Sequence, residues 1–197
     1  MLVRQGLPQT YREDAARLYW QAFGGKLGRV LGPERRAVPF LARVLRADHC
    51  LYVTDDHGTL LGIAGFKSPL GSFAGGDKDD LQAVYGKFGA LWRQGVLHLL
   101  QRDIDNERFL VDGICVERSW RGQGIGSALL DALIAEARWR GYTAVRLDVI
   151  DANIRARALY ERIGFMPWKS ETLGLLRHVF GFSRSTTMIY DLSPGKG

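Results

Sequence analysis

The most regular stretch of the sequence predicts a strand, a polar turn and a helix between residues 108 and 141. Residues 109–116 are apolar except for Asp112 and Gly113, and a polar turn with glycines at 122, 124 and 126 follows them. Beyond the turn, apolar residues recur at helical spacing: Leu129, Leu130, Leu133, Ile134 and Ala137. Gly141 is placed to end this helix in a left-handed conformation. The rest of the chain is organised around this unit.

Helical and strand patterns alternate on both sides of it. Downstream we predict a strand at 142–150, a helix over about 152–163, a short strand at 165–168 and a last strand at 185–191. Upstream we predict a strand at 2–5, a helix opened by the capping box of Thr10 and Glu13 and ended by Gly24 and Gly25, and a helix over 34–47. Strands at 49–54 and 60–67 follow, joined by a turn at 55–58. The pattern predicts one mixed α/β domain over 1–197, without repeats or an interdomain linker.

Two segments differ from this alternation. The pattern of residues 69–106 predicts an insertion that contains a helix starting at Asp77 or Asp79. It carries an apolar stripe on one face: Leu81, Val84, Tyr85, Phe88, Leu91 and Trp92. Such a stripe has to be covered, either by the domain or by a second subunit, or by acting as a lid over a substrate site. Residues 169–184 form a long connection before the last strand. The apolar content of both segments makes a homodimer an option.

The glycine-rich turn is a candidate phosphate site. The first N–H groups of a helix have no internal partner, and the helix dipole adds partial positive charge there. Glycines let the backbone approach an anion closely. The spacing does not match the dinucleotide motif G-x-G-x-x-G, because position 127 is serine, and no Gly-Lys-Ser/Thr triplet of a P-loop follows. Taken alone, the turn is also compatible with a plain strand–helix connection.

The turn in its context resembles a known family. Arg121-x-x-Gly124-x-Gly126 is similar to the R/Q-x-x-G-x-G/A motif with which the GNAT superfamily of N-acetyltransferases binds the pyrophosphate of coenzyme A. The resemblance includes the strand before the turn and a second segment from Asn153 to Phe165. It is specific over 108–168, loose over 1–67 and 185–192, and absent over 69–106 and 169–184.

The resemblance implies a fold and an activity. The fold would be α/β (α+β), with a central mixed, mostly antiparallel sheet of six to seven strands that splays between the fourth and fifth strands. The activity would be acetyl transfer from acetyl-CoA to an amine of a small molecule or a peptide, by direct attack in a ternary complex. One alternative is a regulatory module that binds acyl-CoA without turnover, and another is a basic protein associated with nucleic acid.

The resemblance also assigns cofactor-binding residues. The turn and helix start would bind the pyrophosphate through Arg121, Gly122, Gln123, Gly124, Gly126 and Ser127. The N–H groups of Ile114 and Val116 point to one strand edge, since alternate residues of a strand share a direction. Either could donate to the thioester carbonyl. Asn153 would orient the pantetheine arm or close the strand–helix turn, although asparagine is also an ordinary residue at a helix start.

Tyr160 and Asp112 are the candidate catalytic residues. Tyr160 occupies the position of the family's common tyrosine, and a phenol with a pKa near ~10 can protonate a departing thiolate. Its other reading is a packed helix tyrosine. Asp112 could accept the amine proton directly or through water, or be a structural carboxylate bound to an arginine. Glu117 and Asp148 are alternatives, and a relay through water and backbone would need no single base.

Composition narrows the remaining options. Of the 197 residues, 46% are hydrophobic and 24% charged, as in a globular protein. The net charge of +6 comes mostly from arginines spread along the chain, which makes nucleic-acid binding an unlikely function. No apolar run approaches the ~20 residues that span a bilayer, and no signal peptide is evident, so we expect a cytoplasmic protein. Cys50 and Cys115 are expected to be buried thiols, with Cys115 as a nucleophile the alternative. No metal-binding motif is present.

Overall fold

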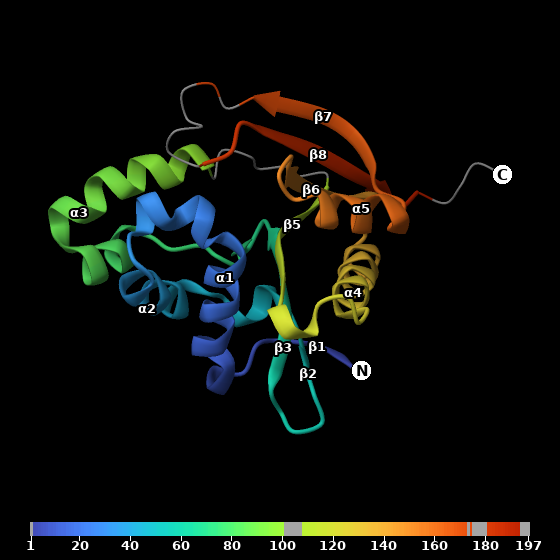
Figure 1. The fold of residues 1–197 in the computed structure, drawn as a ribbon, viewed down its shortest axis with the longest axis horizontal. Coiled ribbons are helices and arrows are strands. Elements are labelled where there is room, and N and C mark those ends of the chain that lie inside the picture. The colour runs from blue at the N-terminus through green and yellow to red at the C-terminus, as the bar shows by residue number, and fades with distance from the viewer. Residues whose placement is uncertain (1, 101–107, 173, 175–180, 194–197) are drawn as a thin grey trace.

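The computed structural model describes residues 2–100, 108–172, 174 and 181–193, which form one mixed sheet with helices on both faces (Figure 1). The strands are β1 (Val3–Gln5), β2 (Cys50–Thr54), β3 (Leu60–Ser68), β4 (Gly71–Ser72), β5 (Phe109–Val116), β6 (Ala144–Ile150), β7 (Met166–Thr172) and β8 (Arg184–Asp191). The helices are α1 (Arg12–Leu31), α2 (Glu34–Val44), α3 (Lys78–Leu100), α4 (Ile125–Trp139) and α5 (Ile154–Ile163). Short 3₁₀ turns are η1 (Gln9–Tyr11), η2 (Ala47–His49) and η3 (Arg118–Trp120).

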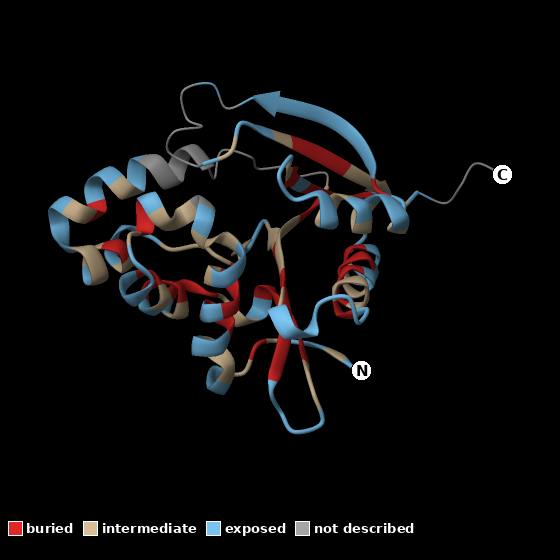
Figure 2. Cartoon of the chain, in the orientation of Figure 1, coloured by how far each residue is buried: buried red, intermediate tan, exposed pale blue. Residues whose placement is uncertain are grey.

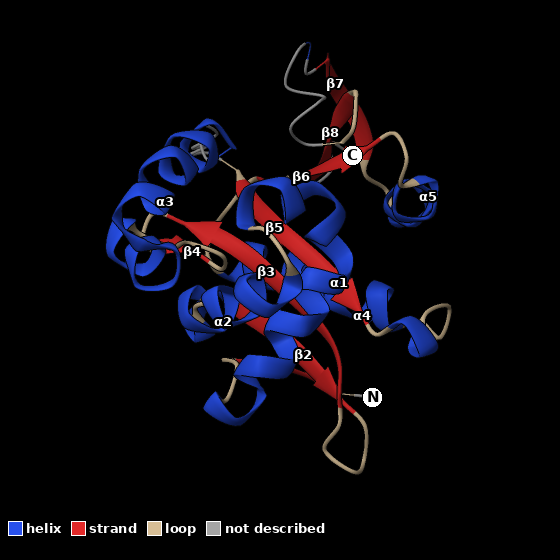
Figure 3. Ribbon diagram, turned by 60° about the vertical axis from the view of Figure 1, so that its left-hand side comes forward, coloured by secondary structure: helices blue, strands red, loops and turns tan. Residues whose placement is uncertain are grey.

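The sheet divides into two halves at β5 and β6. Its order is β1-β2-β3-β5-β6-β8-β7, with β4 paired to β3 outside this path. The neighbours pair antiparallel except β5 and β6, which run parallel. Those two strands pair only through Phe109 with Val145 and Leu110 with Arg146. Beyond these residues they diverge, and Figure 3 shows β7 and β8 well apart from β2, β3 and β5. The predicted splay between two central strands is confirmed.

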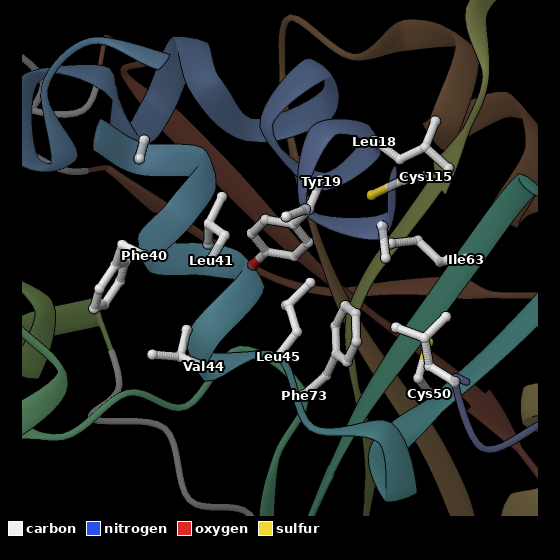
Figure 4. Packing of buried hydrophobic residues seen from close by; sticks show 14 of the residues in the cluster. Leu18, Tyr19, Phe40, Leu41, Val44, Leu45, Cys50, Ile63, Phe73 and Cys115 are labelled. Carbon is white, nitrogen blue, oxygen red and sulfur yellow. The ribbon is translucent and has the colours of Figure 1, made fainter. Parts of the chain in front are cut away.

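Each face of the sheet has its own hydrophobic core. On one face α1, α2 and the start of α3 cover a cluster that includes Tyr19, Leu45, Phe73 and Cys115 (Figure 4). On the other face α4 covers a cluster of the alternate strand residues, including Val145, Leu147 and Val149. Figure 2 shows buried residues concentrated along β3, β5 and the inner side of α4, while β7 is exposed along its length. We call the two sides the α1 face and the α4 face.

The first helix corrects two expectations. The structure shows no side-chain cap at its start, and Thr10 lies in η1, so the predicted capping box is wrong. The predicted stop at Gly24 is also wrong, because α1 continues to Leu31 and ends at Gly32, whose φ is 78°. The last turn buries Val30 completely. Leu31 is buried as well, and burying two such side chains is worth roughly 3–6 kcal/mol, which offsets the ~3 kcal/mol that Gly24, Gly25 and Gly28 together cost in the helix.

The helix predicted in the insertion after β3 is confirmed, but its apolar residues do not lie on a single face. Asp77 begins α3 as expected, since its Oδ1 accepts the N–H groups of Asp79 and Asp80, both at 2.9 Å. Gly86 then kinks the helix with a φ of 70° and a ψ of 171°. The kink rotates the second half, so that Leu81 is buried while Phe88 is 93% exposed. A periodic stripe in the sequence cannot reveal such a break.

The end of the chain contains more strand than the pattern predicted. The strand expected at 165–168 runs from Met166 to Thr172, so the connection to β8 is shorter than 169–184. Residues 173 and 175–180 of that connection lie outside the described residues. The short strand β4 adds to the count as well. The sheet therefore has eight strands where six to seven were expected.

Candidate active site

The turn between β5 and α4 has the backbone of an anion-binding site. Gly122 and Gly124 adopt left-handed conformations, with φ of 81° and 85°. A side chain at either position would be strained whatever the space around it. A Cβ at either position would meet no atom within 4 Å, so the backbone here is open to a ligand. These two glycines fit a bound phosphate group.

The start of α4 supplies the donors. Gly124 is the N-cap residue, and no side chain caps the helix. The first helical hydrogen bond runs from Ala128 N to Gly124 O at 3.0 Å, so the amides of Ile125, Gly126 and Ser127 precede any helical partner. Together with the helix dipole they can bind an anion. Gly126 has a second reason to be glycine, since its Cβ would lie 3.3 Å from Leu159 Cδ2 of α5.

Arg121 contacts the end of β5 and helix α1. Its Nε donates to the carbonyl oxygen of Val116 at 3.0 Å, and its Nη2 is 3.5 Å from Oε1 of Gln21 on α1. Gln21 also reaches Glu117 Oε1 at 3.5 Å. Arg121 therefore joins the end of β5 to α1 and remains exposed beside the turn. No local pattern could indicate Gln21, because its contact with Arg121 spans 100 positions of the chain.

The splayed edge of β5 presents free backbone groups. The N–H of Glu117 donates to Leu61 O of β3 at 2.8 Å. Because alternate residues of a strand point to opposite edges, the N–H groups of Ile114 and Val116 point away from β3, into the gap toward β6. No β6 residue pairs with β5 beyond Leu110. The expected direction of these two N–H groups agrees with the structure.

Tyr160 lies on the α4 face, next to the helix start. Its neighbour Leu159 packs at Gly126, which fixes α5 against the first turn of α4. The Tyr160 ring packs with Phe165 at a centroid distance of 6.0 Å. Burial, with a smaller contribution from Cys115, raises the pKa of Tyr160 to about 12. The phenol is thus a packed helix tyrosine that keeps its proton at neutral pH, as a proton donor requires.

Asn153 and Glu117 have local structural contacts. Asn153 Oδ1 accepts the N–H of Ala156 at 3.3 Å and so caps α5, which is the helix-start role. Glu117 Oε1 accepts the N–H of Arg118 at 2.7 Å and caps η3. The Asn153 amide oxygen and the Glu117 carboxylate oxygen therefore each accept a hydrogen bond from the backbone of the chain.

Asp112 lies at a bulge of β5 on the α1 face. The register of β3 and β5 shifts there, since Gly65 pairs with Gly113 and Phe66 with Val111. Asp112 Oδ2 accepts the N–H of Ala74 at 3.0 Å, and Oδ1 is 3.7 Å from Lys67 Nζ. Its side chain is 12% exposed. The partners of the Asp112 carboxylate are thus a lysine and a backbone amide, whereas a structural carboxylate at this position was expected to bind an arginine.

The two cysteines are buried, as expected. Burial raises the pKa of the Cys115 thiol far above its ordinary value, and that of Cys50 to about 12. A thiol that keeps its proton is a poor nucleophile, so the alternative for Cys115 is not favoured. Within the described residues, no group of His, Cys, Asp and Glu could hold a metal ion. No described helix is long and apolar enough to cross a membrane.

An open pocket of about 790 Å³ lies on the α1 face beside the turn. Residues of α1, the start of β3 and η3 line it, among them Trp20, Gln21, Glu117 and Trp120. It adjoins the carboxyl end of β5, where the phosphate turn begins. The sequence carries no signal for this pocket, because its walls come from four separate segments, the fourth being Glu34 at the start of α2.

Comparison with known proteins identifies the family to which this chain belongs. The family model described as "Acetyltransferase (GNAT) family" matches residues 12–165. The aminoglycoside 2'-N-acetyltransferase of Mycolicibacterium fortuitum is 28% identical over 152 residues, 73% of each chain. The [ribosomal protein bS18]-alanine N-acetyltransferase of Escherichia coli K12 is 44% identical over 52 residues, 26% of this chain and 35% of that protein.

Solved structures share the fold. An N-acetyltransferase from Staphylococcus aureus Mu50 superposes with a TM-score of 0.67 at 15% identity, over 96% of this chain and 100% of that one. A Salmonella typhimurium protein determined with its cofactor acetyl-CoA gives a TM-score of 0.57 at 16% identity, over 100% and 96% of the two chains. The chain belongs to the GNAT family of acetyltransferases, and it is an N-acetyltransferase that uses acetyl-CoA as its cosubstrate to acetylate an amine.

Proposed function

We propose that this enzyme acetylates an amine of a small molecule or a peptide by direct attack, in a single domain whose two faces bind the two substrates. The observation that carries the proposal is the continuity of the uncapped start of α4 with the unpaired edge of β5. The start of α4 offers hydrogen-bond donors for the diphosphate of the cosubstrate, and the edge of β5 offers donors for its extended pantetheine arm. Both belong to a single uninterrupted stretch of chain.

The cofactor-binding residues are those of the turn and the strand edge. The amides of Gly124, Gly126 and Ser127 would bind the diphosphate, while Gly122 and Gln123 shape the turn before them. Arg121 contributes positive charge beside it. Ile114 and Val116 would direct their N–H groups at the arm and at the thioester carbonyl oxygen. Such a donor is worth about 2.7–4 kcal/mol of barrier where it has been measured.

Proton transfer falls to residues on both faces. Acetyl-CoA supplies the acetyl thioester. Tyr160 would protonate the departing sulfur from the α4 face, since its phenol is held neutral. On the α1 face Asp112 would accept the proton of the amine, directly or through water, since its carboxylate has further acceptor positions besides the contacts with Ala74 and Lys67. Asn153 holds the start of α5 and thereby the position of Tyr160.

The acceptor class follows from the relatives only in outline. Their names include an aminoglycoside, a ribosomal-protein alanine and mycothiol acetyltransferase. Small molecules and a peptide terminus are therefore the classes to test. The expected cytoplasmic location and the possible homodimer stay predictions.

Calorimetry and a thiol-release assay test the proposal. Titration with acetyl-CoA should give saturable binding, and no binding at millimolar ligand would refute it. An assay with a panel of amines and peptide N-termini should then release free coenzyme A thiol only when an acceptor is present. Binding without release for any amine would instead support the regulatory module that binds acyl-CoA.

A further inference from the structure

Strand β6 carries a polar group on the splayed part of the sheet. Val145, Leu147 and Val149 point into the core under α4. The alternate residues Arg146 and Asp148 therefore point to the α1 face. Asp148 lies two positions beyond the last residue that pairs with β5, so it borders the gap between the sheet halves.

Two neighbours hold the Asp148 carboxylate from the β6–β8 side. Asp148 pairs directly with Thr187 of β8, and Thr187 Oγ1 donates to Asp148 Oδ1 at 2.5 Å. Arg146 Nη2 lies 3.6 Å from Asp148 Oδ2. Arg146 and Thr187 are 8% and 6% exposed, whereas the Asp148 side chain is 45% exposed. The neighbours are buried and the carboxylate is accessible.

This arrangement suits the binding of a cation. A carboxylate can accept about four hydrogen bonds, so the contacts with Thr187 and Arg146 leave capacity for a ligand. The hydroxyl and the guanidinium also fix the rotamer, which lowers the entropy cost of binding. A charge-assisted hydrogen bond to an ammonium group is roughly twice as strong as a neutral one.

The proposed acceptor side is the α1 face, on which the open pocket beside the turn also lies. The proposed diphosphate donors adjoin α5 and Tyr160, which lie on the α4 face. Gly113 of β5 faces Phe23 and Tyr19 of α1, and Gly181, which lies in the β7–β8 connection, approaches Gly25 of α1. Of the two aspartates on the α1 face that border the gap, Asp112 is 12% exposed and Asp148 is 45% exposed.

We propose that Asp148 determines acceptor specificity by binding a second ammonium group of the acceptor, one that does not react. The acceptor class is then a diamine or polyamine-like molecule, and Thr187 positions the carboxylate. This inference rests on the proposed function, because it assumes that the acceptor enters from the α1 face.

A matched pair of probes tests it. 1,4-Diaminobutane and 1-aminobutane have the same carbon chain and differ by one ammonium group. Calorimetry measures the affinity of the full-length enzyme, saturated with coenzyme A, for each amine. The wild type should bind the diamine at least 10-fold more tightly, and Asp148→Asn should reduce this preference to about threefold or less.

Further variants separate specificity from folding. Asp148→Glu should restore part of the preference, and Thr187→Val should weaken it by less than Asp148→Asn does. Asp151→Asn is the control, because Asp151 follows β6 and is held 3.8 Å from Arg184. It should leave the preference for the diamine unchanged. All variants should bind acetyl-CoA within about twofold of wild type, which a misfolded variant would not do.

Two results would overturn the inference while leaving the proposed function intact. One is a wild type that binds both amines equally, and the other is an Asp148→Asn variant that keeps the full preference for the diamine. Loss of acetyl-CoA binding in the wild type is a different result. It would overturn the proposed function, and this inference with it.

Discussion

The two faces of the splayed sheet are built in different ways. The cofactor site proposed beside the α4 face consists of backbone groups of one continuous stretch, from the free edge of β5 to the uncapped start of α4. The α1 face presents side chains from segments far apart in the chain, such as Asp112 of β5 and Asp148 of β6. A backbone site needs few particular residues, and most of them are glycines. A side-chain site can change its specificity without changing the fold.

The comparison explains why the cosubstrate is easier to assign than the acceptor. Left-handed glycines and an uncapped helix leave a local signal in the sequence, because both depend on neighbours within a few positions. The contacts of Asp112 with Ala74 and Lys67 depend on how β3, β4 and β5 pair. Acceptor residues therefore have no fixed spacing to recognise.

The largest predicted effect tests the backbone site. Gly124→Glu should weaken acetyl-CoA binding by at least about 100-fold. A side chain at a φ of 85° costs of order 1–3 kcal/mol, and the carboxylate would repel the diphosphate. The matched control is Gly141→Glu, since Gly141 has a φ of 79° and open space beyond the other end of α4. Calorimetry should show near-normal affinity for the control, and equal losses would mean that the turn is not the binding site.

The second prediction concerns the proton donor of the α4 face. Tyr160→Phe should lower kcat by about 100-fold, the scale of general acid catalysis, and change the Kd of acetyl-CoA by less than threefold. Tyr142→Phe is a control in the same core cluster. Steady-state kinetics and calorimetry together decide the role, and an unchanged kcat would remove Tyr160 from the mechanism.

The third prediction tests how tightly the α1 face packs on β5. A Cβ on Gly113 would lie 2.7 Å from the Phe23 ring, so Gly113→Ala should destabilise the fold by about 1–3 kcal/mol. For a chain of this length that corresponds to a fall in Tm of a few to about ten degrees. Gly25→Ala, where a Cβ meets nothing within 4 Å, should raise Tm slightly. Thermal unfolding followed by circular dichroism would measure both, and an unchanged Tm for Gly113→Ala would show that α1 can move away from β5.

The smallest predicted effect is a pH dependence of stability. The pKa of Tyr160 is about 12 in the folded chain, against an ordinary value of 10. Below pH 10 the phenol is protonated in both states, and its contribution to stability is fully present. As the pH rises from 10 to 12 the unfolded chain ionises first, so the free energy of unfolding falls. Urea titrations at pH 8, 10 and 11.5 should show a smaller fall for Tyr160→Phe, and identical falls would contradict the burial of the phenol.

Much of the fold could be predicted from the sequence, and the failures have identifiable causes. The strand, turn and helix at 109–139 were predicted within a few residues, because periodicity, glycine and the helix end agree there. The predicted capping box is wrong because Thr10 lies in the 3₁₀ turn before α1. The predicted helix stop at Gly24 is wrong because tertiary burial of residues such as Val30 outweighs local preference. The apolar positions of α3 predict a single face, because nothing in their spacing shows that Gly86 is left-handed.

The sequence by itself determined the elements of the proposed cofactor site: the strand, the glycine spacing of the turn, the helix and the downstream segment from Asn153 to Phe165. These features act through backbone conformation, which neighbouring residues specify. Only the tertiary structure decided which carboxylates share a face, that Asp112 is held by Ala74 and Lys67, and that Asp148 is held by Thr187 yet stays exposed. The reason is that strand pairing and the splay of the sheet bring together residues whose separation along the chain carries no signal.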